Sequence, residues 1–200
     1  RDTNITSWPE HRRARFIGRV FQDPLKGTFG GGTIVQNLSL ASKRGQRRGL
    51  RRGVRTEDLP WFREQIAVLG LGLEDRLYDR AGLLSGGQRQ ALTMIMATMV
   101  RPELLLLDEH TAALDPKTAA QILDVTRSLV STHGLTTLMV THNMQQALDL
   151  GNRLIMMHRG TIILDVRDEE KKALTVDALL HRFHCQGDIE LSDRMLLGTR

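Results

Sequence analysis

The sequence predicts an α/β fold built on a largely parallel sheet, with a helical lobe inserted into it. From Glu103 onward, apolar runs of strand length alternate with segments of helical periodicity, an order typical of parallel sheets. Residues 104–107 are four consecutive leucines, as expected of a strand buried on both faces of such a sheet. Residues 34–83 contain no run of strand type, so this stretch predicts the helical lobe.

The individual elements follow from local signals. Pro9 predicts the start of a short helical turn, and the segment 15–21 predicts a strand that ends before Pro24. Apolar residues at helical spacing predict helices at 34–41 and 59–69. The expected order afterwards is helix 89–101, strand 103–108, helix 116–133, strand 135–141, helix 143–150, strands 153–158 and 161–166, and helix 168–183.

Length and composition indicate one globular domain. The chain has 200 residues, 40% of them apolar and 26% charged, which is enough to bury a core. We expect a single domain over residues 1–200, a helical subdomain at about 34–83, and a C-terminal helix and tail at 168–200. The one cysteine, Cys185, excludes an internal disulfide and fits a reducing compartment. No run approaches the roughly 18 to 20 apolar residues of a membrane span.

A basic run is the strongest charge feature. Residues 43–55 hold seven Lys or Arg and no acid. A solvated surface loop is the interpretation that we favour for such a run. Contact with nucleic acid or lipid headgroups is the alternative, but no aromatic side chain is interleaved for base stacking.

Two adjacent carboxylates end the leucine-rich strand. Ligands of α/β folds bind at the carboxyl ends of parallel strands, and Asp108 stands at such an end. A carboxylate there can hold Mg²⁺, which prefers oxygen ligands. The next residue, Glu109, could orient or deprotonate a water molecule. The alternative is that the two acids only cap a helix.

Two further segments carry polar groups that could meet a ligand. Ser85, Gly86 and Gly87 precede a helix, whose first amides and partial positive charge suit a phosphate. The alternative there is a plain serine-capped helix start. His142 follows a buried strand, as Asp108 does, so parallel neighbours would bring both to the same sheet edge.

These segments together resemble a known family. In order, the chain reads LSGGQRQ at 84–90, LLLLDE at 104–109, Ala-Leu-Asp at 113–115 and VTH at 140–142. This series resembles the ATP-binding subunits of ABC transporters, over about residues 15–160. The resemblance implies an ABC ATPase core of the P-loop NTPase kind, with ATP and Mg²⁺ as cofactors, that hydrolyses ATP to power transport.

The resemblance also implies roles for single residues. Glu109 would be the general base, and His142 the switch histidine that senses the γ-phosphate. Asp108 would bind Mg²⁺, as would Gln22, which falls where the family has its Q-loop. The remaining ATP contacts would come from the signature motif and the D-loop, at Ser85, Gly86, Gly87, Gln88 and Asp115.

Partners and location follow from the same resemblance. The family buries ATP between two copies, so we expect a homodimer or paired ATPase subunit. We also expect transmembrane permease subunits, an indirectly coupled solute-binding protein and no nucleic acid. The chain would lie on the cytoplasmic face of the cell membrane as a peripheral subunit. The segments 20–24 and 108–119, with His110, are most similar to bacterial importers of the tryptophan/tyrosine type.

One family motif does not occur in these 200 residues. No Gly-x-x-x-x-Gly-Lys-Ser/Thr phosphate loop is found, and the glycine-rich segment 27–33 has no following lysine. Only 21 residues stand before Gln22, fewer than the family places there. We therefore expect an N-terminally truncated copy that exposes a sheet edge and, by itself, binds ATP weakly and is inactive.

Two other functions remain open. A soluble ABC-type ATPase acting on DNA or ribosomes is disfavoured, because only 61 residues without heptads separate Gln22 from Leu84 and the chain has one cassette. A non-hydrolysing remnant is favoured by the missing phosphate loop and disfavoured by the presence of Glu109 and His142.

Overall fold

The computed structural model describes residues 3–46 and 53–185. The chain forms two compact units, Arg1–Val140 and Thr141–Arg200, and each is described by itself. Part of the basic run, residues 47–52, lies outside the described residues, as does the tail from residue 186.

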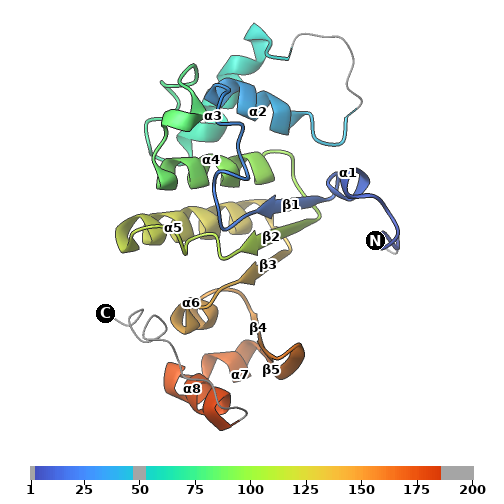
Figure 1. The fold of residues 1–200 in the computed structure, drawn as a ribbon, viewed down its shortest axis with the longest axis vertical. Helices are drawn as coiled ribbons and strands as arrows, with labels where there is room; N and C mark the ends of the chain where they lie inside the picture. The colour runs from blue at the N-terminus through green and yellow to red at the C-terminus, as the bar shows by residue number, and fades with distance from the viewer. Residues whose placement is uncertain (1–2, 47–52, 186–200) are drawn as a thin grey trace. The chain divides into compact units, whose positions relative to one another are not determined.

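A parallel sheet of three strands lies at the centre of the first unit. Its strands are β1 (Ile17–Val20), β2 (Leu104–Asp108) and β3 (Thr137–Val140), in the order β1-β2-β3 (Figure 1). Both pairings are parallel, and Asp108 lies opposite Val140. The carboxyl ends of all three strands therefore share one edge, which confirms the predicted α/β class with a parallel sheet.

Only one face of this sheet is covered by the helices of the first unit. Leu105 and Leu107 are almost fully buried in a core with α4 (Gly86–Thr98) and α5 (Pro116–His133). On β3, Leu138 and Val140 are 53% and 51% exposed. The expected burial on both faces is therefore wrong for the described residues, because β2 alternates between full and partial burial.

Helix α5 begins and ends where the sequence predicts, whereas α4 begins and ends three residues before the limits of 89 and 101 expected for it. Ser85 caps the start of α4, and Asp115 caps α5 just before Pro116. Gly134 ends α5 in the left-handed conformation, with φ 55°, which costs least for glycine. These local signals set the position at which each helix meets the sheet edge.

The expected lobe is helical in its described residues. It contains α2 (Ile34–Ser42), α3 (Leu59–Ala67) and the short 3₁₀ turns η1 (Thr56–Asp58) and η2 (Ala81–Leu83), and none of its described residues lies in a named strand. Phe62 is fully buried and shares one core with α4. The subdomain limits of 34–83 stay a prediction.

The second unit is a hairpin with helices. Helix α6 (Met144–Asp149) precedes the antiparallel strands β4 (Arg153–His158) and β5 (Thr161–Arg167). The chain continues into α7 (Asp168–Lys172) and α8 (Val176–Cys185). Within the described residues, no helix combines the length and apolarity needed to cross a membrane.

The single helix expected at 168–183 is wrong. The chain leaves helical structure after α7, and the Thr175 hydroxyl then accepts the Ala178 N–H at 3.2 Å. A threonine in this position caps a new helix. Apolar residues run through the break, at Ala173, Leu174 and Val176, so the hydrophobic pattern alone did not reveal it.

Candidate functional site

Gln22 and Glu109 meet at the carboxyl edge of the sheet. Gln22 follows β1 by two residues, and Glu109 follows β2 directly. The Gln22 side-chain amide donates a hydrogen bond from Nε2 to Glu109 Oε2 at 3.2 Å. The two residues are 87 positions apart in the chain, so the fold brings them together.

The backbone turns sharply at Glu109. Its φ is 42°, a left-handed conformation that is costly for a residue other than glycine. Its N–H donates to the Val140 carbonyl at 3.0 Å, and its carbonyl accepts from Ala112 at 2.9 Å. These bonds hold the turn in place, and strain of this kind is concentrated at functional sites.

Asp108 carries a cationic partner that the sequence did not point to. Arg19 on β1 places its guanidinium Nη2 3.1 Å from Asp108 Oδ2, with both side chains about half exposed. The same guanidinium lies 4.5 Å from the ring centroid of Phe21. A signal was present, because the alternation of β1 puts Arg19 on the opposite face from the buried Val20.

Gln90 is a second residue to which the sequence assigned no role of its own. Its side chain is fully buried on α4, and its Nε2 donates to the carbonyls of Phe21, at 3.1 Å, and His110, at 2.7 Å. Those carbonyls adjoin Gln22 and Glu109. One buried amide thus ties the segments that follow β1 and β2 to α4.

His110, the residue after Glu109, is buried beside the sharp turn. It is 2% exposed, and its Nε2 lies 3.2 Å from the Thr126 hydroxyl. That hydroxyl donates to the Ile122 carbonyl at 2.7 Å, so the imidazole Nε2–H acts as the donor to Thr126. Burial lowers the pKa of His110 to about 4, which keeps the ring neutral near pH 7.

The signature segment forms a capping box. The Ser85 hydroxyl accepts the Gln88 N–H at 3.2 Å, and Gln88 Oε1 accepts the Ser85 N–H at 3.2 Å. The interpretation as a serine-capped helix start is therefore confirmed as local structure. This cap sets the direction of the first turn of α4, including Gly86 and Gly87.

Thr118 connects the signature segment to the expected D-loop. A Cβ at Gly87 would collide with the Thr118 methyl group, so the close approach of α4 and α5 requires glycine there. The Thr118 N–H also donates to Asp115 Oδ1 at 3.0 Å. Hydrogen bonds from Thr118 lower the pKa of Asp115, which keeps this carboxylate ionised.

His142 belongs to the second unit, so its position relative to Asp108 stays a prediction. Its neighbour Thr141 accepts the Asn143 N–H at 3.0 Å and donates to Gln146 at 3.1 Å. Asn143 in turn caps α6. The segment around His142 is thus an ordered turn between a strand and a helix.

The sheet edge offers oxygen donors of the kind that Mg²⁺ prefers. They are the Asp108 carboxylate and the side-chain carbonyl of Gln22, and phosphates commonly complete such a site. No group of three or more His, Cys, Asp or Glu that could hold a metal occurs within the described ranges. The donor chemistry at the edge fits Mg²⁺ in company with a nucleotide.

Comparison with known sequences identifies relatives of one kind. Residues 1–112 match the family described as ABC transporter. The chain is 46% identical to a tyrosine transport ATP-binding protein of Clostridioides difficile over 183 residues, which cover 90% of this chain and 72% of the relative. It is 37% identical to an aliphatic sulfonates import ATP-binding protein of Agrobacterium fabrum, covering 70% of this chain and 60% of that one.

A methionine import ATP-binding protein of Streptococcus mutans is 35% identical, with coverage of 73% of this chain and 44% of the relative. The chain thus spans between 44% and 72% of the length of these three relatives.

Solved structures share the fold. A putative metal-chelate type ABC transporter in an inward-facing conformation aligns with a TM-score of 0.65 and 22% identity, over 84% of this chain and 64% of that one. The cbiO1 protein of Clostridium perfringens, part of the ABC transporter complex cbiONQ, aligns with a TM-score of 0.64 and 23% identity, over 86% of this chain and 64% of that one.

Proposed function

The chain belongs to the ABC transporter family of ATP-binding proteins, and on that premise we propose that it binds and hydrolyses ATP to power solute import. The observation that carries the proposal is the hydrogen bond between Gln22 and Glu109 beside Asp108. It joins a polar side chain after β1 to the carboxylate pair after β2, at the edge where α/β folds bind ligands.

Glu109 acts in this proposal as the general base. Its carboxylate accepts the proton of the attacking water, and the amide of Gln22 orients that carboxylate through Oε2. Asp108 and the carbonyl oxygen of Gln22 would hold Mg²⁺, which would supply charge to offset that of the phosphates. The strained backbone of Glu109, held by Val140, keeps the base in place.

The signature segment serves a different nucleotide. The first turn of α4 presents amides and a partial positive charge, and we propose that Ser85, Gly86, Gly87 and Gln88 contact the γ-phosphate of ATP bound to a second subunit. Asp115 is joined to this segment through Thr118, and we place it beside the same proposed interface with the second subunit. For His142, in the second unit, we propose the role of γ-phosphate sensor.

The partners follow from the relatives rather than from this chain alone. We propose that transmembrane permease subunits receive the motion, with a solute-binding protein coupled indirectly and the chain peripheral on the cytoplasmic membrane face. The relative at 46% identity is a tyrosine transport ATP-binding protein, so an aromatic amino acid is the proposed class of solute. A soluble ABC-type ATPase and a non-hydrolysing remnant are the alternatives.

The decisive experiment is Glu109→Gln in the complete protein assembled with its permease. Steady-state ATP turnover is expected to fall on the order of 10²- to 10⁴-fold, because water activation is lost, while ATP binding survives. Glu103→Gln is the matched control, since Glu103 directly precedes β2 at its opposite end. Turnover near wild type in Glu109→Gln would show that Glu109 is not the base.

A titration tests whether these 200 residues bind ATP by themselves. Because these residues contain no phosphate loop with its lysine, they are expected to bind ATP weakly or not at all and to be inactive alone. Micromolar affinity of this chain for ATP would contradict that expectation.

A further inference from the structure

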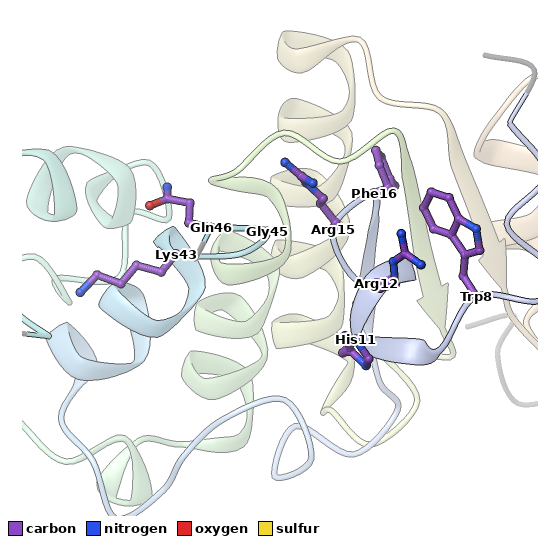
Figure 2. Close-up of a pocket in the computed structure, with 8 residues that line it drawn as sticks. All are labelled: Trp8, His11, Arg12, Arg15, Phe16, Lys43, Gly45 and Gln46. Carbon is purple, nitrogen blue, oxygen red and sulfur yellow. The ribbon is translucent and has the colours of Figure 1, made fainter. Parts of the chain in front are cut away.

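A cavity of about 520 Å³ lies in the first unit, lined by residues that precede β1 and by the turn after α2 (Figure 2). Trp8, α1 (Glu10–Arg13) and Phe16 come before β1, so they lie at the amino end of this strand. Gln22 and Glu109 follow the carboxyl ends of β1 and β2. The cavity therefore lies at the opposite end of the sheet from the proposed ATP site.

Two aromatic rings form one wall of this cavity. The ring centroids of Trp8 and Phe16 are 5.9 Å apart, and Figure 2 shows Arg12 beside Trp8. The Arg12 guanidinium lies 4.8 Å from the Trp8 ring centroid, a cation–π distance. Trp8 thus holds a cation in position, and Trp8 and Phe16 are both only partly exposed.

The lining is cationic and contains no carboxylate. Arg12 and Arg15 supply positive charge, and His11 also lines the cavity. Lys43 also lines the cavity, but its ammonium donates to the Gly53 carbonyl at 2.5 Å and points away from the rings in Figure 2. Glu10, within α1, is not among the lining residues.

Gly45 brings Arg15 into the cavity. Its φ is 75°, and a Cβ there would lie 2.7 Å from the Arg15 side-chain Cγ. The turn therefore needs glycine for its conformation and for the close approach of the arginine stem. The stem of Arg15 is in this way packed against the second segment of the lining, while the residue as a whole is exposed.

We propose that this pocket binds a small organic anion that carries a planar ring. Its acidic group, a phosphate or a carboxylate, would be held by Arg12 and Arg15, because guanidinium groups match both in charge and geometry. Its ring would pack on Trp8 and Phe16. An uncharged ligand would leave the two guanidinium groups without a counter-charge, and a bare anion would not use the aromatic wall.

The test is a fluorescence titration of the full 200-residue chain. Trp61→Phe leaves Trp8 as the single tryptophan, so quenching reports on this pocket. Phenyl phosphate and benzoate are each expected to quench saturably, at concentrations about tenfold lower than inorganic phosphate or phenol, which carry one group each. The tighter of the two identifies the acidic group. Equal strength of all four probes, or no saturation, would overturn the proposal.

Variants localise the binding. Arg12→Gln and Arg15→Gln are each expected to weaken it about tenfold, as for loss of one hydrogen bond to a charged group. Arg63→Gln, at an exposed position on α3, is the matched control and should leave it unchanged. Because Arg12 also packs on Trp8, Arg12→Gln could lower binding by disturbing the fold. Arg15→Gln avoids this ambiguity, and an unchanged thermal midpoint of that variant would show that only binding is lost.

Two further outcomes would exclude this pocket. Unaltered binding in both arginine variants would place the probe elsewhere on the chain. Weakened probe binding in Arg19→Gln would place it at the carboxyl edge of the sheet, beside Asp108. Neither measurement requires ATP hydrolysis, so the proposal stands or falls independently of the proposed function.

Discussion

The two polar regions that we propose to contact ATP are held together in different ways. At the sheet edge, the hydrogen bond between Gln22 and Glu109 joins residues 87 positions apart. The bond from Gln90 to the Phe21 carbonyl joins residues 69 positions apart. The start of α4 is held by bonds between Ser85 and Gln88, three positions apart. The edge is therefore a product of tertiary structure, whereas the helix start is a local motif.

This difference has a consequence for mutation. A change at the edge is expected to disturb several segments at once, because they share the same buried groups. A change at the helix start should cost a cap and little else in the fold. Four substitutions, taken from the largest expected effect to the smallest, test whether this distinction holds.

His110→Gln tests the support beneath the edge. The pKa of His110 is lowered to about 4 in the folded chain, from 6.5 when unfolded, so the unfolded state takes up the proton first as pH falls. The neutral ring therefore contributes on the order of 3 kcal/mol to the free energy of unfolding above pH 6.5. This contribution is lost as the pH falls from 6.5 to 4.

Chemical denaturation at several pH values measures this effect. The variant should lose this part of the pH dependence, and His133→Gln, at the end of α5, should retain it. An equal slope in wild type and His110→Gln would show that the ring is not kept neutral by burial.

Ser85→Ala tests the helix start. Turnover in the complete protein is expected to fall on the order of 10²-fold, as for loss of one donor to a developing negative charge. The free energy of unfolding should fall by only about 1 kcal/mol, the usual cost of a lost cap.

Thr33→Ala is the matched control, because Thr33 forms a capping box with Gln36 at the start of α2. It should show the same loss of stability with normal turnover. Equal turnover in the two alanine variants would reduce Ser85 to a helix cap.

Gln90→Met tests whether one side chain connects the segments that follow β1 and β2. The variant keeps the volume but leaves the carbonyls of Phe21 and His110 without this donor, at a cost of about 1–2 kcal/mol in the free energy of unfolding. Because Gln90 positions Gln22 and Glu109, kcat should fall with little change in KM for ATP. Gln121→Met, at an exposed position on α5, is the control; a stability loss with unchanged kcat would contradict the positioning role.

Arg19→Gln should have the smallest effect on stability. The pair with Asp108 is about half exposed, so its loss should change the free energy of unfolding by less than about 1 kcal/mol. The concentration of Mg²⁺ at half-maximal turnover should fall, since the guanidinium no longer competes for the carboxylate. Arg127→Gln removes an exposed pair with Asp124 and should leave the Mg²⁺ dependence unchanged; an equal shift in both variants would argue against competition at Asp108.

Much of the framework could be predicted from local signals. The helix α5 begins at Pro116 and ends at His133, as expected, because proline, an aspartate cap and a C-terminal glycine mark both ends. The break between α7 and α8 was missed, since Thr175 signals a cap only once the chain has left the helix. The partial exposure of β2 was also missed, because a leucine run does not reveal which faces are covered.

The sequence by itself determined the family, the order of strands and helices, and the residues that carry the proposed chemistry. Those depend on spacing along the chain, which local hydrogen bonds and hydrophobic periodicity express directly. Only the tertiary structure decided that Gln22 bonds to Glu109, that Arg19 pairs with Asp108, and that one buried amide of Gln90 serves both segments. Each of these contacts joins residues brought together by parallel pairing and helix packing, and no local pattern encodes which side chains then face one another.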